Sequence, residues 1–79
     1  MAMFNVLLID DDTELTTMLA QYLAREGFQV HAVHDGQSGV EEGVGGGYAI
    51  VVLDIMMPRL SGIDVLQRIR ESSAVPVLS

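Results

Sequence analysis

Aspartates stand at the ends of two apolar segments of the chain. Asp10, Asp11 and Asp12 follow the nearly unbroken apolar run at 4–9, and Asp54 ends the segment YAIVVLD at 48–54. Neighbouring carboxylates repel one another, so the triplet requires a compensating positive charge. A pocket of carboxylate oxygens suits a hard cation, and Mg²⁺ is the natural candidate. Such a site also suits phosphoryl transfer, because the metal offsets charge on the transferred group while a carboxylate acts as nucleophile.

The positions of these aspartates favour different roles for them. Asp54 is a single residue that leads into a loop, which favours it as the nucleophile. Asp10 and Asp11 are better placed to hold the metal. Asp12 is explained as the N-cap of a following helix, where a carboxylate stabilises the helix by about 0.3–1 kcal/mol.

The apolar pattern of the chain predicts alternating strands and helices. Strands are predicted at 4–9, 28–33, 48–54 and 74–79, and helices at 13–26 and 63–71. The helix at 13–26 has a predicted apolar face that includes Met18 and Tyr22. Residues 37–48 occupy the place of another helix, which we expect to be short or frayed because each interior glycine costs about 1 kcal/mol.

The order β-α-β-α-β-α-β predicts an α/β fold with parallel strands joined by right-handed crossovers. Open parallel sheets bind ligands outside the carboxyl ends of their strands, where the strand order reverses. If the first and third strands are neighbours, Asp10, Asp11 and Asp54 converge in one pocket. A divalent cation there would compensate the clustered charge.

Composition narrows the classes of function. The 79 residues suffice for one small domain or part of one, and 49% of them are hydrophobic. A net charge of −7 with only four basic residues argues against direct nucleic-acid contact. The absence of cysteine excludes disulfides and favours a reducing cytoplasm. No apolar run approaches the roughly 20 residues of a membrane-spanning helix, and no secretory signal is visible, so no membrane association is expected.

Other polar, methionine and glycine-rich features have structural explanations. His31 and His34 share no strand face and are interpreted as surface histidines. Met56 and Met57 are expected to fill gaps beneath a loop. The glycines at 43–47 lack the Lys-Ser/Thr of a phosphate-binding loop, and we interpret them as a loop of low order.

Four stretches resemble the receiver domain of bacterial two-component response regulators: LLIDDDTEL, EGFQVHAVHDGQSGV, YAIVVLDIMMPRLSGIDVLQRIR and VPVLS. The most specific features are the acidic pair after the first strand and LDIMMPRLSG after the third, in which Pro58 and Gly62 match loop-shaping positions. The resemblance covers essentially the whole chain and is somewhat closer to receivers of winged-helix transcription regulators. It implies a flavodoxin-like sheet of strand order 2-1-3-4-5 with helices on both faces. It also implies a cytoplasmic signalling module rather than an enzyme.

In that family a sensor histidine kinase donates a phosphoryl group to an aspartate, which Asp54 matches, and an output domain reads the result. Asp10 and Asp11 match the family's acidic pair. The resemblance implies that Asp11 ligates Mg²⁺ directly and Asp10 mainly through water. The backbone carbonyl of Met56 would supply another oxygen.

A full receiver has five βα units, so residues 1–79 are expected to form a partial receiver domain. Its last unit, with the family's switch Ser/Thr, lysine and switch aromatic, would be missing, as would the output domain. We therefore expect weak Mg²⁺ binding and poor phosphorylation. The open edge of the last strand predicts a homodimer or a strand-exchanged assembly, although Pro76 removes one donor from that edge.

Two other functions remain open. DDDT after the first strand also fits an aspartate-nucleophile phosphatase of the haloacid dehalogenase kind, although that family has Thr where this chain has Glu14 and needs a longer chain. The other alternative is a scaffold that binds partners without being phosphorylated. Capture of beryllofluoride at Asp54 would favour the receiver, turnover of a phosphomonoester the phosphatase, and inertness in both assays the scaffold.

Overall fold

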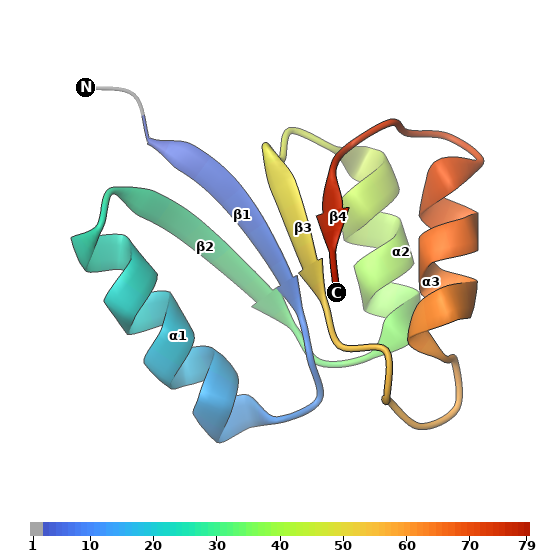
Figure 1. Cartoon of the computed structure of the whole chain (residues 1–79), viewed down its shortest axis with the longest axis horizontal. Helices are drawn as coiled ribbons and strands as arrows, with labels where there is room; N and C mark the ends of the chain where they lie inside the picture. Colours follow the sequence, from blue (N-terminus) through green and yellow to red (C-terminus); the bar gives the residue numbers. More distant parts are fainter. Residues whose placement is uncertain (1–2) are drawn as a thin grey trace.

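Four parallel strands form the sheet of the computed structural model, which describes residues 3–79 (Figure 1). The elements are, in chain order, β1 (Phe4–Ile9), α1 (Thr13–Arg25), β2 (Phe28–Val33), α2 (Gly36–Gly45), β3 (Ile50–Leu53), α3 (Gly62–Arg70) and β4 (Val77–Leu78). The strand order is β2-β1-β3-β4, and every neighbouring pair is parallel. This arrangement confirms the predicted α/β fold and the first four positions of the flavodoxin-like order.

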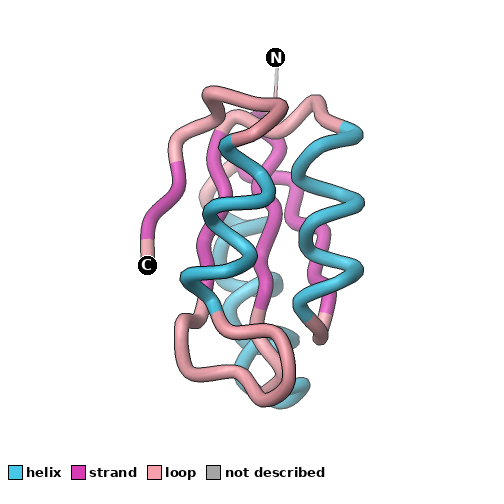
Figure 2. Tube along the Cα trace, turned by 90° about the vertical axis from the view of Figure 1, so that its right-hand side faces the viewer, coloured by secondary structure: helices cyan, strands magenta, loops and turns pink. Residues whose placement is uncertain are grey.

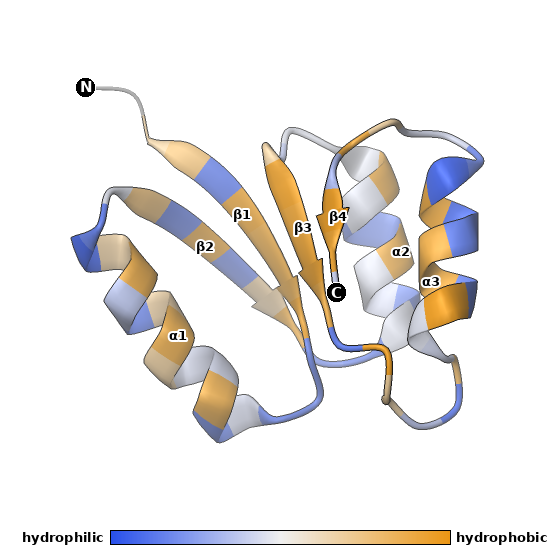
Figure 3. Cartoon of the chain, in the orientation of Figure 1, coloured by the Kyte–Doolittle hydropathy of each residue, from blue (hydrophilic) through white to orange (hydrophobic). Residues whose placement is uncertain are grey.

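Helices lie on both faces of the sheet, α1 on one face and α2 with α3 on the other (Figure 1; Figure 2). The hydropathy pattern follows from this layering: β3 is apolar along its length, whereas β2, at the edge of the sheet, alternates (Figure 3). The main core lies between the sheet and the α2–α3 layer; its buried members are Leu7, Ile9, Val51, Leu53, Met57, Val65 and Ile69. None of the helices within residues 3–79 has the length and apolar character needed to cross a bilayer.

Helix α2 is longer and better packed than its glycine content predicts. It spans ten residues, so the expectation of a short or frayed helix was wrong, and only Gly46 and Gly47 of the glycine-rich run lie outside it. A Cβ added at Gly39 would lie 2.8 Å from Cδ1 of Ile9, and one at Gly43 would lie 2.8 Å from Cδ1 of Ile69. These glycines allow α2 to approach β1 and α3 closely, and the resulting packing offsets their poor helix propensity.

Other predicted features also differ from the structure in detail. Strand β3 begins at Ile50, and β4 comprises two residues rather than the predicted 74–79. The apolar face of α1 is narrower than predicted, since Met18 is 60% exposed and Tyr22 is 57% exposed. Thr16, which is 1% exposed, takes the most buried position of that helix instead.

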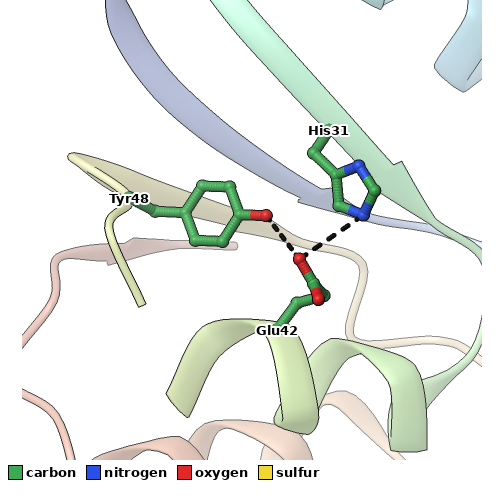
Figure 4. A network of polar contacts seen from close by, with 3 residues as sticks. All are labelled: His31, Glu42 and Tyr48. Atoms are coloured by element: carbon green, nitrogen blue, oxygen red, sulfur yellow. Dashed lines mark hydrogen bonds and ion pairs between the residues drawn. The ribbon is translucent and has the colours of Figure 1, made fainter. Parts of the chain in front are cut away.

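A polar contact joins α2 to β2 and to the segment that precedes β3 (Figure 4). The hydroxyl of Tyr48 donates a hydrogen bond to Oε1 of Glu42 at 2.6 Å, and the same oxygen lies 3.5 Å from Nε2 of His31. The rings of His31 and Tyr48 stack with their centroids 6.5 Å apart. Burial, followed by the hydrogen bond to the Glu42 carboxylate, raises the pKa of Tyr48 to about 12.

We expect alkaline pH to destabilise the fold through Tyr48. The folded chain favours the neutral phenol, so this stabilisation is complete below the ordinary pKa of 10.0 and is lost as pH rises through about 12. Allowing for solvent screening, the loss should be about 1–2 kcal/mol. The chain has no lysine, and Tyr22 is its other tyrosine, so Tyr22→Phe serves as the control.

Denaturant unfolding at about pH 9 and about pH 11 measures this effect. The wild type and Tyr22→Phe should lose more stability between the two conditions than Tyr48→Phe does. In Tyr22→Phe, the absorbance of the remaining tyrosinate should rise with a midpoint at about pH 12. An identical pH dependence in all three proteins would contradict the assignment to Tyr48.

Candidate functional site

The predicted convergence of the three aspartates is present in the structure. Strands β1 and β3 are neighbours, and their register pairs Ile9 with Leu53, so the residues that follow both strands leave the sheet at the same level. Carboxylate oxygens of Asp10, Asp11 and Asp54 all lie within 4.8 Å of one another. Asp11 is exposed, whereas Asp10 and Asp54 are half-buried. One compact group of acidic oxygens therefore stands at the carboxyl edge of the sheet.

Backbone amides hold the two half-buried carboxylates in place. Oδ1 of Asp10 accepts a hydrogen bond from the backbone N–H of Asp12 at 2.9 Å. Oδ1 of Asp54 accepts one from the backbone N–H of Met56, also at 2.9 Å. Each carboxylate is thus oriented by the residue two positions further along the chain, and its second oxygen remains available for a ligand.

Asp12 has the role that its sequence position predicts. Its side chain accepts a hydrogen bond from the backbone N–H of Leu15 at 3.0 Å and forms the N-cap of α1. Asp12 is therefore committed to the helix, which separates it from the acidic group formed by the other three aspartates.

The acidic group has the donor set and the charge that a divalent cation needs. Its ligand atoms are oxygens, which suit Mg²⁺. Among residues 3–79, the only contact of ion-pair type joins His31 to Glu42, so no basic side chain of the described chain neutralises the three aspartates. The residues present therefore fit a bound Mg²⁺.

The two methionines after Asp54 have different surroundings. Met57 is 6% exposed and packs in the core, as expected, but Met56 is 83% exposed, so the prediction that it fills a gap beneath the loop was wrong. The loop turns between these residues, so adjacent side chains face opposite environments. The backbone N–H of Met56 contacts the site by donating a hydrogen bond to Asp54.

Residues after β2 complete this edge of the sheet, a role that the sequence pattern did not predict. His34 is exposed, as predicted, but its Nδ1 lies 3.1 Å from the carbonyl oxygen of Asp10. Asp35 caps α2 by accepting a hydrogen bond from the backbone N–H of Ser38 at 2.8 Å. That bond, followed by one from the Ser38 hydroxyl, lowers the pKa of the Asp35 carboxyl. The position of His34 in the sequence could have indicated this contact, because His34 directly follows β2, which ends beside Asp10.

Comparison with known proteins identifies the architecture. Residues 6–79 match the family model of the response regulator receiver domain. The chain belongs to this family. The receiver domain described here is therefore a signalling module, and its sheet order and acidic edge are those expected of the family.

The relatives that this chain resembles are much longer than the part of them that matches it. This receiver domain is 43% identical over 76 residues to the transcriptional regulatory protein CpxR homolog of Haemophilus influenzae, a match that covers 96% of this chain and 33% of that protein. The chain thus spans about a third of the length of the curated relatives it matches.

Two solved structures share the fold and concern one regulator, TrrA of Thermotoga maritima. TrrA in complex with Mg²⁺ and BeF is 32% identical, with a TM-score of 0.81, and the match covers 87% of this chain and 60% of that one. TrrA in complex with the histidine kinase ThkA is 29% identical, with a TM-score of 0.85, and the match covers 95% of this chain and 66% of that one.

Proposed function

We propose that this receiver domain accepts a phosphoryl group on Asp54 in a Mg²⁺-dependent reaction. The observation that carries the proposal is the approach of carboxylate oxygens from Asp10, Asp11 and Asp54 to within 4.8 Å of one another. The complex of TrrA with Mg²⁺ and BeF supports it, because that similar protein binds both components of such a site.

Each residue of the site has a distinct task in this proposal. Asp10, Asp11, Asp54 and the backbone carbonyl of Met56 would hold Mg²⁺, with Asp11 a direct ligand and Asp10 acting mainly through water. When bound, Mg²⁺ offsets negative charge on the transferred group. The N–H of Met56 fixes one oxygen of Asp54 at 2.9 Å, which leaves the other carboxylate oxygen to attack phosphorus while the bond between phosphorus and the donor breaks and the donor group leaves.

The comparisons also support a proposal for the partners. TrrA binds the histidine kinase ThkA, so a sensor histidine kinase is the proposed phosphoryl donor. The CpxR homolog is a transcriptional regulatory protein, which suggests that residues 1–79 act as a partial receiver domain of a DNA-binding regulator. We place such a regulator in the cytoplasm, where a kinase domain and DNA are both accessible.

Labelling with a small phosphodonor tests the proposed function. The chain incubated with acetyl phosphate and Mg²⁺ should gain the mass of one phosphoryl group, and beryllofluoride should bind in the presence of Mg²⁺. Labelling should be slow, because the sequence contains no lysine to pair with the phosphoryl group. Asp54→Asn should abolish both signals, whereas Asp64→Asn, an exposed aspartate of α3, should retain them.

Three outcomes would contradict this function. Labelling that persists in Asp54→Asn would show that Asp54 is not the phosphoryl acceptor, and labelling without Mg²⁺ would show that the metal is not required. Steady turnover of a phosphomonoester would support the phosphatase alternative. Failure of both labelling and beryllofluoride capture would support a scaffold.

We also propose that the 79-residue chain self-associates through β4. This strand is at the edge of the sheet, and Leu78 is 60% exposed. An unpaired edge with apolar side chains favours pairing with a second copy. Light scattering should give a dimer mass for the wild type, whereas Leu78→Lys should shift the equilibrium toward the monomer. A monomeric wild type at high concentration would contradict this proposal.

A further inference from the structure

The loop that carries Asp10 and Asp11 is held by the neighbouring strand. The backbone N–H of Asp10 donates to the carbonyl oxygen of Val33 at 3.1 Å, and Nδ1 of His34 lies 3.1 Å from the carbonyl oxygen of Asp10. A carbonyl oxygen only accepts, so the proton of the second hydrogen bond is on Nδ1. Both polar backbone groups of Asp10 are therefore bonded to residues at the end of β2.

His34 itself lies between two fixed elements. Strand β2 ends at Val33, and Asp35 begins the cap of α2. The Asp35 carboxylate accepts hydrogen bonds from both the backbone N–H and the hydroxyl of Ser38, at 2.8 and 2.9 Å. The imidazole ring therefore extends from a short, well-anchored segment, which makes it a firm attachment point for the Asp10 carbonyl.

Asp11 depends on this attachment for its position. It stands between Asp10, whose backbone β2 holds, and Asp12, whose side chain caps α1. In addition, the N–H of Asp12 is bonded to Oδ1 of Asp10 at 2.9 Å. Repulsion between neighbouring carboxylates tends to spread the loop in the absence of a cation. A hydrogen bond from outside the loop opposes that spreading.

We propose that His34 is a positioning residue of the metal site. Its Nδ1–H holds the Asp10 carbonyl so that Asp10 and Asp11 already face Asp54 before the cation arrives, which lowers the cost of ordering the loop on binding. This inference rests on the proposed function, and it deepens it. His34 is not one of the residues whose ligand atoms converge, so it acts through the Asp10 backbone rather than as a ligand.

A pair of substitutions at position 34 separates the hydrogen bond from the bulk of the side chain. In His34→Asn the side-chain amide nitrogen is as many bonds from Cβ as Nδ1 and keeps a donor there. His34→Leu has similar bulk and no donor. His31→Leu is the matched control, because His31 lies on β2, shortly before His34, but contacts Glu42 and Tyr48 instead of the aspartates.

Titration of backbone amide resonances with MgCl₂ gives the dissociation constant of each variant. We expect His34→Leu to weaken Mg²⁺ binding about threefold to tenfold, which is typical of the loss of one supporting hydrogen bond. His34→Asn and His31→Leu should remain within about twofold of the wild type. Equal weakening in His34→Asn and His34→Leu, or no weakening in His34→Leu, would overturn the inference.

Hydrogen exchange without metal gives a second, independent readout. Protection of the Asp10 and Asp12 amides should fall in His34→Leu and be retained in His34→Asn, while that of Val51 in the central strand β3 stays constant. If the wild type binds no Mg²⁺, the proposed function loses its metal, and the exchange experiment still decides the role of His34. Unchanged protection at Asp10 and Asp12 in His34→Leu would show that the ring does not hold the loop.

Discussion

Gly62→Ala is expected to destabilise the fold by about 3 kcal/mol or more, because the new methyl group has no space. A Cβ at this position would lie 2.2 Å from Cα of Ile55 and 2.8 Å from its Cβ. The nearest atom belongs to the backbone, so no side-chain rotation relieves the overlap. The gain in helix propensity, about 1 kcal/mol at most, does not offset this cost. Urea unfolding of the wild type and the variant measures the difference.

The same substitution should also disturb the acidic site. Gly62 is the first residue of α3, and its N–H donates to the carbonyl oxygen of Ile55 at 3.3 Å. Ile55 directly follows Asp54, and the next residue, Met56, supplies the N–H that orients the Asp54 carboxylate. Moving Ile55 therefore moves both the aspartate and its donor, and phosphoryl labelling should be lost even at temperatures where the variant is folded.

Gly45→Ala is the matched control for this prediction. Gly45 is the last residue of α2, and a Cβ there would have no atom within 4 Å. Its replacement should leave labelling unchanged and stabilise the fold by up to about 1 kcal/mol. If Gly62→Ala were as stable as Gly45→Ala, the close approach between α3 and the loop after β3 would not be real.

The Gly62 contact illustrates which parts of the fold are predictable from the sequence. The bounds of β1 and β2 were predicted correctly, because a nearly unbroken apolar run and an alternation of apolar and polar residues are strong local signals. The length and order of helix α2 were underestimated. Helix propensity counts the cost of Gly39 and Gly43 but not the packing against Ile9 and Ile69 that the small size of these glycines allows. Close approach between segments far apart in the sequence leaves no periodic signal.

The candidate site also has features that the sequence predicts and contacts that it does not. The convergence of Asp10, Asp11 and Asp54 was predictable, because parallel strands that are neighbours bring their carboxyl ends together. The contact of His34 with the Asp10 carbonyl was not, because a side chain that bonds to a backbone group 24 residues away has no counterpart in local sequence spacing. Residues that carry charge were thus identified, whereas a residue that positions them was not.

Neutralising Asp11 is expected to change stability in opposite directions with and without Mg²⁺. Without the metal, three carboxylates whose oxygens lie within 4.8 Å repel one another. Two unit charges at such a separation repel by about 1 kcal/mol in water and by more near a protein surface. Asp11→Asn removes two of the three repulsive pairs, so the free energy of unfolding in EDTA should rise by about 1 kcal/mol or more.

With Mg²⁺ the wild type should become more stable than Asp11→Asn, the reverse of their order in EDTA. A ligand that binds only the folded state stabilises it by about 2.7 kcal/mol at a hundred times its dissociation constant, and the wild type should show this gain. Asp11→Asn lacks the carboxylate that we propose as a direct ligand, so its gain should be much smaller. Asp12→Asn makes the same chemical change at the adjacent residue and keeps a good N-cap, so it should respond to Mg²⁺ like the wild type. If Asp11→Asn stays more stable than the wild type at every Mg²⁺ concentration, repulsion is the whole effect of the cluster and the three aspartates do not share a cation.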